Sequence, residues 1–114
     1  MRSFKYLFAA FVFTGLLCQF SFSYAVTDEA KEANNKGFVE FNGRDIDAAI
    51  TDYTKAIELS ADFALAYYNR GLARREKNDA EGEIADYTKA IELDPQYTAA
   101  YYNRGLAREE KGDL

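Results

Sequence analysis

The sequence contains no histidine and no tryptophan, and it has only one cysteine and one proline in 114 residues. Without histidine, there can be no histidine-based catalytic triad, general base or metal site. A single cysteine excludes an intramolecular disulfide and a zinc site built from four cysteines. Basic residues are in the minority, 14 against 19 acidic residues, and the formal net charge is −5. This balance argues against non-specific nucleic-acid binding, in which Lys and Arg neutralise phosphates.

The first 25 residues have the pattern of a secretory signal peptide. Arg2 and Lys5 form a short positive region, and the run 6–22 that follows carries no charge. Ser23-Tyr24-Ala25 then places small residues at the two positions that a signal peptidase requires. We therefore predict an exported protein, periplasmic or secreted, whose mature chain is residues 26–114.

An uncleaved membrane anchor is the alternative for this N-terminal segment. The mainly apolar run 6–22 has seventeen residues, at the short limit of a transmembrane helix. An anchored protein would be a membrane-tethered assembly factor, with the membrane as a partner in that case only. Lipidation of Cys18 is not favoured, because Leu17 stands where a bacterial lipoprotein signal has a small residue. The mass of the mature protein distinguishes cleavage from anchoring.

The rest of the chain repeats with a period of 34 residues. The octapeptide 52–59 recurs unchanged as 86–93, and the nonapeptide 66–74 recurs as 100–108. A weaker copy begins earlier, since Asn35-Lys36-Gly37 lies one period before Asn69-Arg70-Gly71. Self-similarity at one period is typical of repeat architectures.

Each unit is predicted to be a pair of α-helices. Ala80, Ile84 and Tyr87 follow the i, i+4, i+7 spacing of an amphipathic helix. Asp45 and Asp79 stand where helix N-caps are needed, and the single Pro follows the end of another helix. The predicted helices are 28–42, 46–59, 63–77, 80–93 and 97–111. They form units of about 30–63 and 64–97 and an incomplete unit 98–114, in an all-α fold of antiparallel hairpins.

These features resemble the tetratricopeptide repeat (TPR) family of 34-residue helix-turn-helix units. The residues that carry the resemblance are small or aromatic: Tyr67, Gly71, Tyr87, Ala90 and Pro95, with Gly37, Tyr53, Ala56, Tyr101 and Gly105 in the neighbouring units. In an antiparallel hairpin, residues with nearly constant index sums face each other, so Gly71 is expected to meet the ring of Tyr87. The resemblance implies an α-solenoid of about two and a half units that serves as a protein–protein interaction module without cofactor or metal. We do not expect an enzyme, because no nucleophile with a base and no ligand cluster is present.

The chain departs from the family pattern at several charged positions. Arginines stand at positions that are usually apolar or aromatic in the family: Arg70, Arg74, Arg104 and Arg108. Glu83 stands where the family usually has Ala. The index sums place Glu83 opposite Arg74, and we predict a compensating ion pair between them. The recurring Asp52 and Asp86 are interpreted as solvated residues of the scaffold.

The candidate binding residues are three asparagines that recur at the period: Asn35, Asn69 and Asn103. Each precedes a glycine by two residues and so points about 200° away from it around the helix. The resemblance implies that such asparagines line a concave groove and bond the backbone of an extended peptide. The alternative is that each is a tolerated polar residue on an exposed face. Tyr68 and Tyr102 precede two of the asparagines and are the candidate flanking contacts.

The carboxylate clamp of chaperone-binding TPR proteins is not supported by the sequence. Of its five positions only Asn69 matches, and the other four are Asn34, Phe38, Ala99 and Asn103. Removal of Arg2 and Lys5 with the signal peptide changes the net charge from −5 to −7, which favours basic or neutral ligands.

The third unit ends at Leu114, just after its first helix. Repeat arrays normally need about three units and a polar terminal cap. Either the last helix serves as a cap, or the chain is a fragment of a longer TPR protein. We expect its apolar side to favour a homodimer or to leave the helix frayed.

Overall fold

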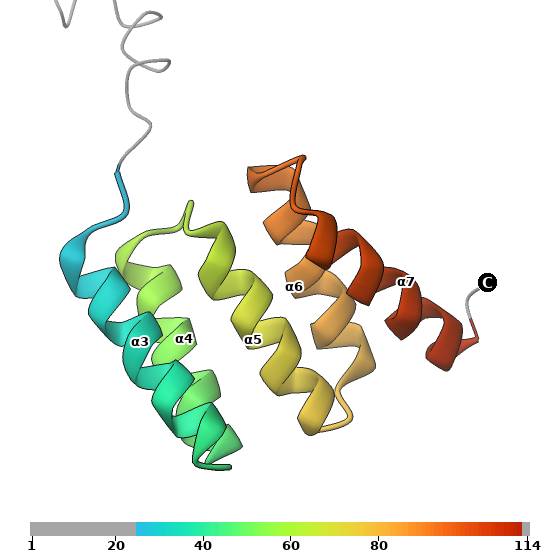
Figure 1. The fold of residues 1–114 in the computed structure, drawn as a ribbon, viewed down its shortest axis with the longest axis horizontal. Helices are drawn as coiled ribbons and strands as arrows, with labels where there is room; N and C mark the ends of the chain where they lie inside the picture. The colour runs from blue at the N-terminus through green and yellow to red at the C-terminus, as the bar shows by residue number, and fades with distance from the viewer. Residues whose placement is uncertain (1–24, 113–114) are drawn as a thin grey trace, which may run out of the picture.

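The computed structural model describes residues 25–112, which form five α-helices (Figure 1). They are α3 (Asp28–Asn42), α4 (Ile46–Leu59), α5 (Ala64–Glu76), α6 (Ala80–Leu93) and α7 (Thr98–Lys111). Every boundary lies within one residue of its prediction, and no β-strand occurs between residues 25 and 112. The predicted all-α hairpin fold is therefore confirmed. The predicted signal peptide lies outside the described residues except for its last residue, Ala25.

The helix starts are fixed by short polar side chains and by a repeated turn. Asp45 accepts a hydrogen bond from the backbone N–H of Ala48 at the start of α4. Asp79 does the same for Gly82 in α6, at 3.0 Å. The residue before each cap is left-handed, with φ of 68° at Arg44 and 58° at Asn78. These caps satisfy backbone donors that a helix N-terminus otherwise leaves unpaired.

Each helix packs against the next one along the chain, and α3 also contacts α5. The hairpins consequently stand side by side, with α3 at one end of the array and α7 at the other (Figure 1). The core consists mainly of alanines and tyrosines. Tyr53 and Tyr87 are the largest fully buried side chains.

A glycine meets a tyrosine ring inside each complete hairpin. A Cβ placed on Gly71 would lie 2.6 Å from Cε1 of Tyr87, and one on Gly37 would lie 2.8 Å from the ring of Tyr53. The predicted contact between Gly71 and Tyr87 is confirmed. The absence of a side chain at each glycine lets the paired helices approach closely.

The last helix, α7, is packed on one side only. Ala100 and Ala107 are buried, and Ala100 belongs to the same core cluster as Tyr87 of α6. A Cβ at Gly105 would have no neighbour within 4 Å, unlike one at Gly71, because no described helix follows α7. The part of the chain that the structure describes contains no helix long and apolar enough to span a bilayer.

Candidate functional site

The three candidate asparagines lie at equivalent places on α3, α5 and α7, but their surroundings differ. Asn35 is exposed. Asn69 Nδ2 donates a hydrogen bond to Oδ1 of Asn34 at 3.0 Å. Asn103 Nδ2 donates to the hydroxyl oxygen of Tyr68 at 2.8 Å. Both bonds join the first helix of one unit to the first helix of the unit before it. Asn69 and Asn103 therefore contribute to the contact between units, a role that the sequence did not indicate.

The acceptors of these bonds also occupy one repeated position. Asn34 and Tyr68 are one period apart, and each lies 35 residues before the asparagine that it contacts. Asn34 is only 4% exposed, so its hydrogen bond satisfies a buried amide. Among residues 25–112, no group donates a hydrogen bond to Oδ1 of Asn69 or Asn103. Within this part of the chain, both oxygens are therefore hydrogen-bond acceptors without a donor.

The two candidate tyrosines do not have equivalent environments. The ring of Tyr68 stacks on Tyr97, with centroids 4.9 Å apart, and is tilted against Tyr87 at 5.7 Å. Burial in this cluster raises the pKa of Tyr97 to about 12. Tyr68 thus serves mainly in packing, whereas Tyr102 is 68% exposed on α7. Of the two, Tyr102 has the side chain that is accessible to a partner.

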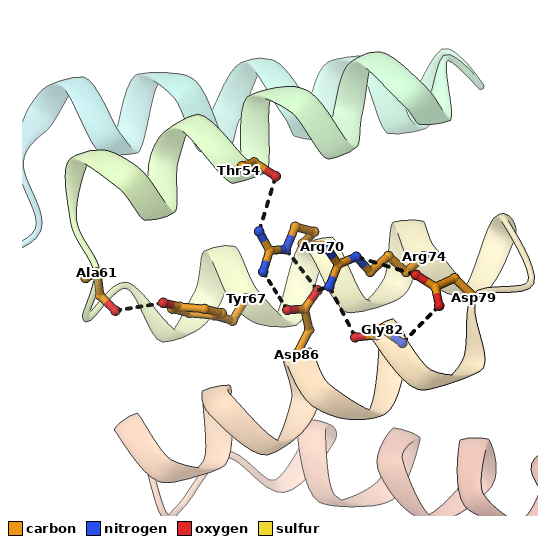
Figure 2. Close-up of polar contacts among 8 residues, drawn as sticks. All are labelled: Thr54, Ala61, Tyr67, Arg70, Arg74, Asp79, Gly82 and Asp86. Carbon is orange, nitrogen blue, oxygen red and sulfur yellow. Dashed lines mark hydrogen bonds and ion pairs between the residues drawn. The ribbon is translucent and has the colours of Figure 1, made fainter.

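A buried carboxylate joins three helices near the middle of the array (Figure 2). Asp86 on α6 accepts from Nη2 and Nε of Arg70 at 2.8 and 2.9 Å, and from Nη1 of Arg74 at 3.0 Å. Arg70 also donates to the Thr54 hydroxyl on α4 at 3.2 Å. The Asp86 side chain is 3% exposed. Its interpretation as a solvated scaffold residue is therefore wrong, and Asp52, 9% exposed, is buried as well.

The predicted ion pair between Arg74 and Glu83 is also wrong. Arg74 pairs with Asp86 and, at 3.9 Å, with Asp79, and it donates to the backbone oxygen of Gly82 (Figure 2). The index sum gives the level of a residue along the hairpin but does not give the side of the helix on which it lies. Glu83 lies on another side of α6, where it lines a cavity together with Glu110 of α7.

Glu83 is a buried acid whose Oε1 has no hydrogen-bond partner among the described residues. Burial raises the pKa of Glu83, and the Tyr87 hydroxyl and Arg75 lower it in part. A cavity of about 130 Å³ adjoins it, lined by Arg75, Asn78, Ala80, Glu83, Glu110 and Lys111. A second cavity, of about 290 Å³, lies on the first hairpin and is lined in part by Lys36 and Asp52. Between residues 25 and 112, no group of His, Cys, Asp or Glu side chains could hold a metal ion.

The model of the TPR repeat family matches residues 40–77 and 71–112. The chain belongs to the TPR family. The fold is similar to the TPR domain of Arabidopsis OM64, with 31% identity, coverage of 78% of this chain and 74% of that chain, and a TM-score of 0.74. No curated protein matches the chain.

Similar TPR domains have also been solved in complexes. The second TPR of Spaghetti (RPAP3), bound to the HSP90 peptide SRMEEVD, is 32% identical, with 76% of this chain and 81% of that chain covered and a TM-score of 0.74. The TPR2B domain of yeast Sti1, in a pHsp70 complex, is 31% identical, with 76% and 70% covered and a TM-score of 0.74. The TPR domain of this chain thus has the fold of protein-interaction modules.

Two polar features of this TPR array were missed in the sequence. Asp86 and Arg70 have an index sum of 156, close to the 158 of Gly71 and Tyr87, so the hairpin rule contained a signal for their contact. The buried amide of Asn34 had no such signal, because the other units have tyrosine at its position.

Proposed function

We propose that the TPR array binds an extended segment of a partner protein across its first helices, α3, α5 and α7. The observation that carries the proposal is the common register of Asn35, Asn69 and Asn103 on those helices. The inter-unit hydrogen bonds of Asn69 and Asn103 engage Nδ2 and orient each carboxamide. Their Oδ1 atoms are then positioned to accept hydrogen bonds from the backbone N–H groups of a ligand.

The length of the bound segment follows from the spacing of the helices. Packed helices lie about 8–10 Å apart, and an extended chain advances about 3.3 Å per residue. One repeat therefore corresponds to about three residues of ligand, and the three asparagines span roughly six to nine. Backbone contacts of this kind depend little on ligand sequence, so selectivity falls to exposed neighbours such as Tyr102.

The ligand that we propose is basic or neutral rather than an acidic C-terminal peptide. The chain carries a net charge of −5, which the removal of Arg2 and Lys5 would change to −7. The similar structure of the second TPR of Spaghetti (RPAP3) contains the acidic peptide SRMEEVD. This chain has Asn34, Phe38 and Ala99 at clamp positions where the resemblance calls for other residues. A terminal carboxylate would therefore find few of the donors it needs.

The test uses peptides selected from a random nonapeptide library with the protein as bait. Replacement of Asn35, Asn69 and Asn103 by alanine should weaken their binding by about 1–3 kcal/mol, given about 0.5–1.5 kcal/mol per hydrogen bond and incomplete additivity. Asn34→Ala is the comparison variant: it removes the acceptor that orients the Asn69 carboxamide but keeps all three asparagines, so it should weaken binding less than the triple variant does. Binding that is unchanged in the triple variant, or equally weakened by Asn34→Ala, would contradict the proposal.

We further propose that the protein acts after export, on the periplasmic or outer side of a membrane. The support is the pattern of residues 1–25 in the sequence. Mass spectrometry of the protein recovered after expression with its own N-terminus is the test. A mature chain that begins at Val26 supports export with cleavage, and a retained N-terminus in the membrane fraction supports the anchored alternative instead.

A further inference from the structure

The open side of α7 repeats the surface with which α5 contacts α6. Arg104 Nη1 donates to the Thr88 hydroxyl at 3.3 Å, as Arg70 one unit earlier donates to Thr54 at 3.2 Å. Each guanidinium also lies over the ring of the tyrosine three residues before it, at 5.6 Å for Arg104 and 5.7 Å for Arg70. Arg104 therefore already has the conformation in which Arg70, one unit earlier, binds the carboxylate of Asp86.

In the complete hairpin, α6 supplies two groups to this surface of α5. The Asp86 carboxylate pairs with Arg70 and Arg74, and the Tyr87 ring covers Gly71. Both groups come from adjacent residues, one turn before Ala90, which lies in the same core cluster as Tyr67. The complementary helix thus presents Asp-Tyr-x-x-Ala on the face that contacts α5.

The corresponding surface of α7 has no such partner within residues 25–112. Arg104 and Arg108 stand at the places of Arg70 and Arg74, and neither forms an ion pair with a described residue. A Cβ at Gly105 would meet nothing within 4 Å. Tyr101, at the place of Tyr67, is 44% exposed. The surface therefore combines two available guanidinium groups with an open slot for a ring.

We propose that this surface of α7 binds an amphipathic helix of a partner protein that carries the pattern Asp-Tyr-x-x-Ala. The carboxylate of the partner pairs with Arg104 and Arg108, its tyrosine ring covers Gly105, and its small residue packs on Tyr101. The aspartate of the partner helix is complementary to the positive charge of Arg104 and Arg108. The partner helix would pack on α7 as α6 packs on α5. This surface is separate from the asparagines of the proposed peptide groove.

A folded second copy of the chain does not fit the same surface. The chain has this pattern twice, in α4 and α6, but both copies are already engaged. Tyr53 is 1% exposed, Tyr87 is 0% exposed and Asp86 is 2% exposed. A second copy would have to open a hairpin to supply them, which exposes its own core. A partner with an unpaired helix has no such cost.

The probe is a fluorescein-labelled synthetic peptide with the sequence of residues 79–94, titrated with the protein and followed by fluorescence anisotropy. We expect saturable binding. Arg104→Ala with Arg108→Ala should weaken it at least tenfold, because the acid of the peptide is left unpaired. Gly105→Leu should have a similar effect by filling the slot, and it spares the fold because that side is open. The peptide with alanine in place of Asp86 and Tyr87 is the matched control and should not bind.

A grafted chain covers the case in which the free peptide is too weakly helical to bind. Gly112 has φ of 83°, in the same left-handed region as Asn78 (58°) before α6. A copy of residues 81–94 joined after Leu114 therefore follows a turn of the correct kind. We expect the graft to raise the midpoint of urea unfolding. A graft in which the copies of Asp86 and Tyr87 are replaced by alanine should not raise the midpoint.

Three results would overturn the proposal. One is peptide binding that Gly105→Leu and the double arginine variant leave unchanged, because the site would then lie elsewhere. Another is the absence of peptide binding together with a graft that adds no stability. The third is a dimer in sedimentation analysis that Gly105→Leu dissociates, which would assign the surface to a second copy.

Discussion

The buried carboxylate of Asp86 provides the sharpest test of how the array is stabilised. Asp86→Ala removes the acceptor of three charged hydrogen bonds from Arg70 and Arg74. Loss of one member of a buried ion pair typically costs about 3–5 kcal/mol, because the other charge remains desolvated. The arginine side chains keep 14% and 26% of their exposure and can partly rehydrate. We therefore expect the free energy of unfolding to fall by about 2–4 kcal/mol.

Asp52→Ala is the matched control, one period earlier in the sequence. Within residues 25–112, Asp52 forms one ion pair, with Lys36 at 3.6 Å, and that lysine side chain is 68% exposed. At the position of Arg74 the first unit has Glu40, and the neighbouring Asp52, together with burial, raises the pKa of Glu40. The loss of Asp52 therefore breaks one weak pair and relieves one repulsion. The expected change is about 0–1 kcal/mol.

Urea unfolding followed by circular dichroism at 222 nm compares the two variants with the wild type at pH 7. The reasoning requires Asp86→Ala to be the more damaging variant by at least about 1 kcal/mol, given the ranges above. Equal losses in the two variants would refute it, because they would show that the arginines of the second unit do not depend on their buried acceptor. High salt should reduce the difference only slightly, since Asp86 is shielded from solvent.

Four further variants have expected outcomes. Gly71→Ala should lower the free energy of unfolding by about 1–3 kcal/mol, because the new methyl group clashes with Tyr87. Gly105→Ala should raise the free energy of unfolding by about 0.5–1 kcal/mol, because its methyl group meets no neighbour and alanine is the better helix former. Equal effects of the two variants in chemical unfolding would contradict the packing described. Burial raises the folded-state pKa of Glu83 above its usual value near 4.5. Protonation of Glu83 therefore stabilises the folded wild type fully below pH 4.5, and this stabilisation is lost as the pH rises through the folded-state pKa. The stability of Glu83→Ala relative to wild type should therefore increase from pH 4 to pH 8 in thermal unfolding scans, and a flat difference would count against it. Tyr68→Phe should cost about 0.5–1.5 kcal/mol by removing the acceptor of Asn103, and amide exchange in α7 should accelerate; unchanged exchange would show that the bond contributes nothing.

The helices were predictable because their signals are local. Asp45 and Asp79 cap α4 and α6 where the sequence places them, and the period fixes which residues are equivalent. The contact of Gly71 with Tyr87 followed from hairpin geometry alone. Such features need only two neighbouring helices and the residue order.

The polar contacts were less predictable because they need a third helix. Arg70 reaches both Asp86 on α6 and Thr54 on α4, which lies in the preceding unit. The hairpin rule places Arg74 level with Glu83 but cannot tell that Asp86 lies on the nearer side of α6. The candidate asparagines were located by their period, but their hydrogen bonds between units depend on how adjacent units are stacked.

The Thr54–Arg70–Asp86 chain of hydrogen bonds has a consequence for the order in which the array comes apart. It crosses the boundary between the first and second units, so neither hairpin can open without disturbing the other. In a linear array, such nearest-neighbour coupling determines how far unfolding spreads once it begins. The α7 helix has only the weaker version of this link, the hydrogen bond from Arg104 to Thr88 without a buried acid. Unfolding should therefore start at α7 and stop at α6, and the two complete hairpins should then be lost together as one cooperative block.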